Sequence, residues 1–192
     1  MHVRLPALIV AVGAVVALNG CDSTSIKAQF ENVDTTATVF ALNGTPSTFP
    51  SALAFRNGKS NPVRVDASFL FDVAFDLDTA GSVRVYTMRA LASQFVAGHS
   101  VGLKQDSTPF VNVRFAPTSG YKFDSSMVVP VGRTVLVDVI EQSCSQFSVL
   151  GQHIYAKFVI DSAKTSTRTL YVHFLANLNC GFVSLGEGVP DK

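Results

Sequence analysis

The sequence of 192 residues contains no tryptophan, few charged residues and no cluster of basic ones. Charged side chains make up 15% of the chain, and 15 Lys and Arg stand against 14 Asp and Glu, so the formal net charge is only +1. Nucleic-acid binding is not expected, because phosphates are bound through a concentrated excess of Lys and Arg. Intrinsic disorder is excluded too, since it requires low hydrophobicity and 47% of these residues are apolar.

The aromatic residues are mostly phenylalanine, with 15 Phe against 4 Tyr. Sugar-binding β-sandwiches commonly present tryptophan, whose large flat ring stacks on pyranose rings, so the missing tryptophan lowers the expectation of glycan binding. The phenylalanines are expected in the core by default, and an exposed group of them would mark a contact with protein or lipid.

The N-terminal region has the pattern of a signal peptide. Met1–Arg4 is a short cationic start, and Leu5–Leu18 is an apolar run interrupted only by Pro6. A membrane-spanning helix needs about 20 apolar residues, and the polar residues that follow Leu18 make this run too short. The sequence therefore predicts a segment that directs export.

The four residues Leu18-Asn19-Gly20-Cys21 resemble the lipobox of bacterial lipoproteins, in which a small residue precedes a lipidated cysteine. Asn19 stands where that family usually has a small or aliphatic residue. The resemblance covers only the N-terminal tenth of the chain. It implies a signal peptide over 1–20, lipidation of Cys21, and attachment to a membrane on the extracytoplasmic, periplasmic side of a bacterial cell envelope. An uncleaved anchor and an ordinary secretory signal are the alternatives.

Cys144 and Cys180 are the two other cysteines. In an oxidising compartment such a pair predicts a disulfide, and with Cys21 carrying lipid only one pairing remains. Closing a loop of about 37 residues would stabilise the fold by about 4 kcal/mol in the chain-entropy model. Two unpaired buried thiols are the alternative. A zinc site is disfavoured because no further closely spaced Cys or His accompanies the pair.

Short runs with a period of two follow a polar lead over 21–33, which is predicted to be a tether. Phe69–Leu77 alternates clearly, and Thr79-Ala80-Gly81 then predicts a three-residue hairpin loop with glycine at its left-handed position. In that register Phe75 lies opposite Val85 on the buried side.

The other face of this predicted strand carries Asp72, Asp76 and Asp78. We expect a solvated face, with Arg84 opposite Asp76 in a cross-strand ion pair. A calcium site is disfavoured, because Asp72 and Asp78 would lie about 20 Å apart at about 3.3 Å per residue.

Further strands are predicted at Thr36–Leu42, Ala52–Arg56, Val111–Phe115, Thr134–Ile140, Ile154–Ile160 and Leu170–Leu178, the last two forming a second hairpin. Met88–Val96 fits either a short helix or a strand. About eight strands without a long amphipathic helix predict an all-β fold, with one antiparallel β-sandwich over 34–192 and a barrel as the alternative.

Gly98-His99-Ser100-Val101-Gly102 matches G-x-S-x-G, the nucleophile elbow of serine hydrolases. That chemistry needs a helix after the serine, but Leu103–Thr108 is short and polar and is stopped by Pro109. A β-turn containing His99 is therefore favoured, with catalysis by Ser100 as the alternative. The residues that would complete the triad are Asp138 with His153, or Asp161 with His173. His173 is expected at the surface.

These observations predict a protein without catalytic residues, metal or cofactor. The leading hypothesis is a non-enzymatic, lipid-anchored structural or interaction protein. It would act as an accessory extrinsic subunit that docks on a membrane-embedded complex, for example of the respiratory or photosynthetic type. A lipoprotein that binds a small ligand or a glycan is the first alternative, and a serine hydrolase built on Ser100 is the second.

Overall fold

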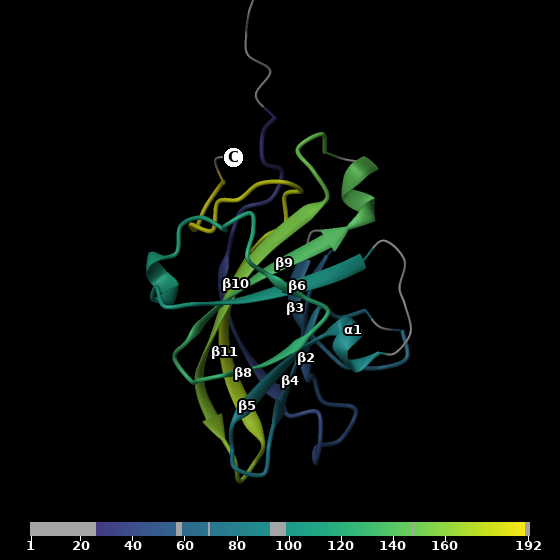
Figure 1. The fold of residues 1–192 in the computed structure, drawn as a ribbon, viewed down its shortest axis with the longest axis vertical. Coiled ribbons are helices and arrows are strands. Elements are labelled where there is room, and N and C mark those ends of the chain that lie inside the picture. The colour runs from purple at the N-terminus through teal and green to yellow at the C-terminus, as the bar shows by residue number, and fades with distance from the viewer. Residues whose placement is uncertain (1–25, 57–58, 69, 93–98, 147, 191–192) are drawn as a thin grey trace, which may run out of the picture.

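Two antiparallel β-sheets packed face to face form a sandwich in the computed structural model, which describes residues 26–56, 59–68, 70–92, 99–146 and 148–190 (Figure 1). The first sheet has six strands, in the order β1 (Asp34–Phe40), β11 (Thr169–Asn177), β10 (His153–Lys164), β9 (Thr134–Glu141), β6 (His99–Asp106) and β7 (Lys122–Phe123). The second has five, in the order β3 (Lys59–Val63), β2 (Ala52–Arg56), β4 (Val73–Leu77), β5 (Val83–Thr87) and β8 (Ser126–Val129). The predicted all-β sandwich is confirmed, and in the described residues the sheets do not close into a barrel.

In the described residues, helical structure is limited to three short segments, α1 (Met88–Leu91), η1 (Phe110–Asn112) and η2 (Gln142–Gln146). The ambiguous segment that starts at Met88 thus forms one helical turn, and its residues from 93 onward lie outside the described part. Among the described residues, none of the helices has the length and apolar character needed to span a bilayer. The predicted signal peptide and Cys21 lie outside the described residues.

The β4–β5 hairpin has the predicted register. Leu77 pairs with Val83 and Phe75 with Val85, and Gly81 takes a φ of +82° in the loop. The side chain of Asp78 fixes this loop by accepting hydrogen bonds from the amides of Ala80 and Ser82 at 2.9 and 2.8 Å. A glycine in the left-handed region and a carboxylate before it are the ordinary chemistry of such a turn.

The β10–β11 hairpin is also confirmed. Ala156 pairs with Ala176 and Phe158 with Phe174, and a bulge follows Ile160. The apolar faces of both strands point toward the other sheet, where Phe158 meets Phe75 edge to face at 5.5 Å between ring centres. The core therefore lies between the two sheets, as the period of two predicts.

The outer faces of both sheets are covered in part, which the sequence pattern does not show. Phe71, Ala74 and Met88 form a small apolar cluster on the outside of the five-stranded sheet. A second cluster covers the six-stranded sheet, where Phe110 and Val113 pack with residues of β9, β10 and β11.

The predicted strand Val111–Phe115 is wrong, because this segment forms η1 and an irregular loop over the six-stranded sheet. The buried ammonium group of Lys157 donates hydrogen bonds to the carbonyls of Phe110 and Val113, both at 2.9 Å. The loop thereby supplies the acceptors that a buried cation needs. Burial lowers the pKa of Lys157.

Candidate functional site

A pocket of about 320 Å³ lies at the end of the sandwich where the described chain begins, and we call this end the pocket end. Three segments form it: the lead at 26–33, the region of η2 up to residue 152, and the loop at 178–190. They gather at the top of Figure 1, where the C-terminus is marked. The apolar lining consists of Ile26, Phe30, Ile154, Leu178, Phe182 and the disulfide.

Asn179 ties the lead of the chain to the loop that follows β11. Its side-chain oxygen accepts hydrogen bonds from the amides of Gln29 and Phe30 at 2.6 and 2.9 Å, and its amide nitrogen donates to the Phe30 carbonyl at 2.8 Å. Asn32, two residues after Phe30, uses its side-chain amide to donate hydrogen bonds to the carbonyls of Ser184 and Gly186. Residues 29–32 are thereby held against the sandwich.

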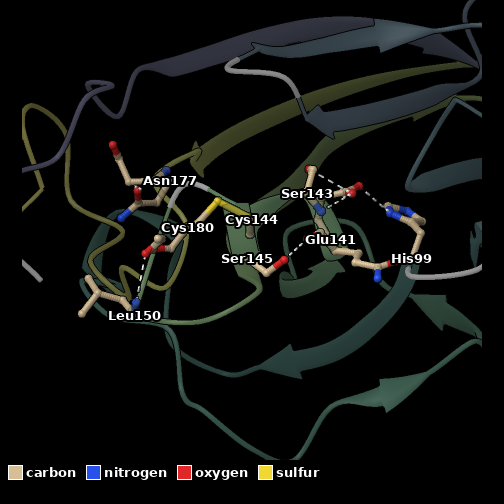
Figure 2. Close-up of a disulfide and its surroundings, with 11 residues drawn as sticks. His99, Glu141, Ser143, Cys144, Ser145, Leu150, Asn177 and Cys180 are labelled. Carbon is tan, nitrogen blue, oxygen red and sulfur yellow. Dashed lines mark hydrogen bonds and ion pairs between the residues drawn. A yellow bond between two sulfur atoms is a disulfide. The ribbon is translucent and has the colours of Figure 1, made fainter.

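The predicted disulfide between Cys144 and Cys180 forms part of the pocket wall (Figure 2). It links η2 to the loop after β11 across a sequence separation of 36 residues. Beside it, the Ser148 hydroxyl donates to the Cys180 carbonyl at 2.9 Å. The disulfide and this hydrogen bond fix two walls of the pocket relative to each other.

The inner polar groups of the pocket already have partners within the protein. Glu141 accepts hydrogen bonds from the amide and hydroxyl of Ser143 at 3.2 and 3.0 Å, and its other oxygen faces His99 at 3.1 Å. Ser148 and Asn179 are bonded as described above. Polar atoms that are already paired gain little from a new partner, so the pocket offers a ligand mainly apolar contact.

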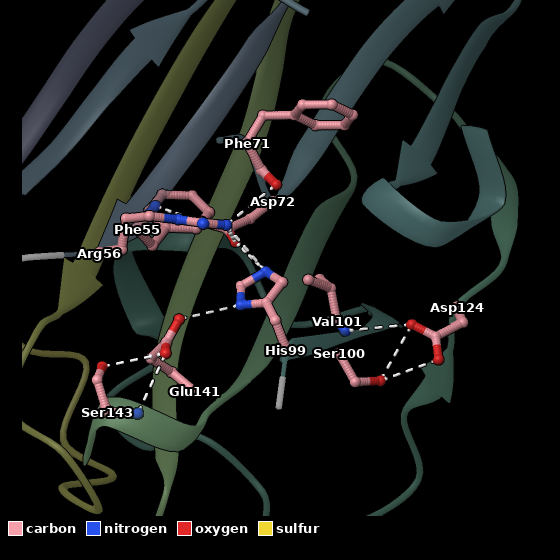
Figure 3. A network of polar contacts seen from close by, with 10 residues as sticks. All are labelled: Phe55, Arg56, Phe71, Asp72, His99, Ser100, Val101, Asp124, Glu141 and Ser143. Carbon is pink, nitrogen blue, oxygen red and sulfur yellow. Dashed lines mark hydrogen bonds and ion pairs between the residues drawn. The ribbon is translucent and has the colours of Figure 1, made fainter. Parts of the chain in front are cut away.

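A buried network of charged groups adjoins the pocket and joins the two sheets (Figure 3). The His99 ring lies between two carboxylates, with Nε2 at 2.8 Å from Asp72 and Nδ1 at 3.1 Å from Glu141. Arg56 donates to the same Asp72 oxygen at 2.7 Å. Arg56 ends β2 and Asp72 precedes β4, whereas His99 begins β6 and Glu141 ends β9. The network therefore connects the sheets at the pocket end.

Asp72 is the centre of this network, and its predicted place on a solvated face is wrong. The residue is fully buried, and its second oxygen accepts the Phe55 amide at 2.5 Å. Burial alone would raise the pKa of Asp72, but His99, Arg56 and the Phe55 amide together hold it below its usual range. His99 belongs to strand β6, so the turn predicted at this position is wrong as well.

Asp76 is also buried, and its ion pair is with Arg168 at 3.1 Å rather than with Arg84. The cross-strand register of Asp76 and Arg84 is as predicted, but the Arg84 side chain lies near Ser126. Arg168, in the β10–β11 turn, also donates to the Leu77 carbonyl at 2.7 Å and covers the carboxylate. A partner 92 residues away in sequence is not visible in a local pattern.

Ser100 is the second residue of β6 and pairs with Ile140 of β9. Its hydroxyl donates to Asp124, with both carboxylate oxygens at 3.0 Å. His153 pairs with the same Ile140 from the far side, so two strand spacings, about 10 Å, separate Ser100 from that histidine. A β-carbon on Gly102 would lie 2.8 Å from the Tyr121 Cβ, so close packing accounts for this glycine of the motif. Gly98 lies outside the described residues.

Asp138 and His153 do form a pair, at 2.7 Å, on the outside of the six-stranded sheet. Burial raises the pKa of Asp138 despite the opposing effect of His153. Tyr155 stacks on the His153 ring, and burial raises the pKa of its hydroxyl to about 12. The hydroxyl of Ser100 lies outside the reach of this pair.

His173 and Asp161 were the other candidate pair for a triad. His173 is half-buried, bonds to Asp34 and packs on Phe110. Asp161 is exposed on β10. In the described part of the chain, no group of three or more His, Cys, Asp or Glu side chains is placed to hold a metal ion.

Comparison of the chain with protein-family models, curated proteins and solved structures gave no match.

The pocket itself was not predicted from the sequence. Phe30, Asn179 and Phe182 lie in segments without periodic pattern. They meet because β9 and β11 end, and β1 and β10 begin, at the same end of the six-stranded sheet. The predicted pairing of Cys144 with Cys180 was the one signal in the sequence that brought the η2 region and the loop after β11 together. A predicted disulfide thus marks the neighbourhood of the pocket, but its apolar lining depends on the fold.

Proposed function

We propose that the protein is a non-enzymatic, lipid-anchored binding protein of the bacterial cell envelope that takes a small apolar molecule, or the apolar part of an amphiphile, in the pocket. The observation that carries the proposal is the pocket itself, with its apolar lining and its internally paired polar groups. Its volume of about 320 Å³ lies at the lower end of the range of small-molecule sites. The ligand is accordingly small.

The lipid anchor is supported by the sequence before the described residues. The apolar run Leu5–Leu18 and Cys21 supply the features of a lipoprotein signal. The Cys144–Cys180 disulfide is consistent with this, because disulfides persist in oxidising compartments outside the cytoplasm.

A binding role without catalysis is supported by the contacts of Ser100. Its hydroxyl is bonded to a carboxylate that is itself paired with Arg89, and nucleophile activation would need a histidine in that place. His153, the histidine paired with Asp138, lies two strands away from this serine.

The test uses N-phenyl-1-naphthylamine, a small apolar dye whose fluorescence rises in apolar sites. The wild-type protein is expected to increase its emission in a saturable way. Leu178→Trp, which fills the pocket from its half-buried wall, should abolish this increase. Leu42→Trp is the matched control, because Leu42 is also half-buried but follows β1 at the opposite end. An absent increase, or an equal increase with both variants, would refute the pocket as the binding site.

A second candidate function is docking on a membrane-embedded protein complex as an accessory subunit. It is favoured by Val111 and Phe115, which are 67% and 62% exposed on the loop that covers the six-stranded sheet. Exposed apolar side chains that form a contiguous patch are typical of protein contacts, and a partner docked on this loop would cover both residues. A stoichiometric complex purified in mild detergent should be lost with Phe115→Ser but kept with Val131→Ser, an exposed valine of the β8–β9 turn. Equal recovery would exclude this surface.

A further inference from the structure

Exposed apolar residues gather on all three segments of the pocket end. Val149 is 89% exposed, Val189 64% and Phe30 41%, and Leu150 stands beside Val149 with a similar exposure to Phe30. Exposed apolar side chains that gather on one surface are typical of a contact with a protein or a membrane.

These residues belong to one surface because their loops are tied together. Ser148 bonds to the loop of Cys180, and Leu150 packs so closely on Gly181 that a β-carbon there would lie 2.5 Å from the Leu150 Cβ. On the other side, Asn32 and Gly188 exchange two backbone hydrogen bonds, of 2.8 and 3.0 Å. The loops therefore keep their relative positions without a partner.

The same end receives the chain from the proposed anchor. The described chain begins at Ile26, which lines the pocket, and only five residue steps separate it from Cys21. Fully extended, five residues span at most about 18 Å. A lipid on Cys21 would therefore hold the pocket end close to the bilayer, whatever course the intervening residues take.

We propose that the pocket end rests on the bilayer surface, with Phe30, Val149, Leu150 and Val189 inserted among the lipid headgroups. This inference rests on the lipid anchor of the proposed function. The charged residues of the three loops, Lys27, Glu31 and Glu187, form no basic cluster. Burial of apolar surface, rather than attraction to anionic lipid, therefore drives the contact, and added salt should not weaken it.

The lack of tryptophan in the sequence permits a direct test, because one introduced tryptophan is then the only one in the protein. The full chain is expressed in a bacterial host that lipidates it, and acylation of Cys21 is verified by mass spectrometry. The lipidated protein is then reconstituted into phosphatidylcholine vesicles with or without brominated acyl chains, which quench tryptophan only at short range. The reporters are Val149→Trp and Val189→Trp, on two different loops.

Val131→Trp is the matched control, since Val131 is also an exposed valine. Val131 adjoins Gly132, whose amide donates a hydrogen bond to the Ile160 carbonyl of β10. Ile160 lies seven residues along this strand from His153, which is at the pocket end, so Val131 is about 23 Å from that end. Loss and blue shift of emission from both pocket-end reporters, at low and high salt, with an unchanged Val131→Trp signal, would support the contact. If the pocket-end reporters stay unquenched in an acylated, vesicle-bound protein, the proposed bilayer contact is overturned. A protein partner or a second copy would then be the molecule that covers this surface. An unacylated chain that stays off the vesicles would overturn the proposed anchor and the contact together.

Discussion

Replacing Asp72 by asparagine tests the charge network between the two sheets. The asparagine keeps the shape of the side chain but removes the negative charge that faces Arg56 and His99 at 2.7 and 2.8 Å. Removing one partner from a buried ion pair typically costs 3–5 kcal/mol, because the other charge stays buried without compensation. Since one oxygen remains to accept the Phe55 amide, we expect a loss of about 3 kcal/mol in the free energy of unfolding.

The loss is measured by urea unfolding followed by circular dichroism, with the slope of the transition required to stay constant. In a thermal scan it corresponds to a decrease of about 6–12 °C for a domain of this size. Asp161→Asn is the control, because Asp161 is exposed on β10 and its replacement should change stability by less than about 0.5 kcal/mol. A cost for Asp72→Asn no greater than that of the control would refute the assigned role of the network.

The same variant makes a prediction about pH. The pKa of Asp72 is lowered in the folded protein, so its contribution to stability is present above the ordinary value of 3.8 and is lost as the pH falls below it. The difference between wild type and Asp72→Asn should therefore shrink on acidification below about pH 4. A difference that stays constant with pH would show that the ionised carboxylate is not its source.

Three further predictions concern other parts of the fold. Reduction of the Cys144–Cys180 disulfide should lower the free energy of unfolding by about 4 kcal/mol, and neither thiol should react with a maleimide before reduction; labelling without reductant would contradict the disulfide. Asp138→Asn should gain stability relative to wild type as the pH rises from about 4 to 7, because burial raises the pKa of Asp138 in the folded protein. This change is opposite in sign to the one expected for Asp72→Asn, and urea midpoints of Asp138→Asn that follow those of wild type at every pH would disprove it. Ser100 should not be labelled by a fluorophosphonate probe in the intact protein, and labelling that is lost in Ser100→Ala would establish the hydrolase alternative.

Local pattern was sufficient to predict the two hairpins. In β4–β5, alternation fixes which side chains face the core and the short loop fixes the register. In β10–β11, alternation alone showed the core-facing side chains, so Phe75 and Phe158 could both be placed from the sequence. The same alternation predicted the outward direction of Asp76 but not its burial, because Arg168 covers it from a distant turn.

The candidate site depended on contacts that no local pattern contains. Lys157 alternates with core residues and resembles a surface lysine, yet η1 covers it. His99 was placed in a turn because glycines flank it, whereas it pairs with Glu141 at the start of β6. In each case the deciding partner lies more than 40 residues away in the chain. The cysteine pair, 36 residues apart, was the longest-range contact that the sequence predicted.

The backbone hydrogen bonds between Asn32 and Gly188 place the two ends of the folded domain side by side. A short linker could therefore join them, and new termini could be opened in the β10–β11 turn, at the opposite end of the sandwich. In such a circular permutant the proposed anchor, carried on the new N-terminus, would lie at the end of the sandwich opposite the pocket, with every core contact retained. Such a permutant would separate the effect of the proposed anchor's position from that of the apolar pocket end on the orientation of the domain at a membrane.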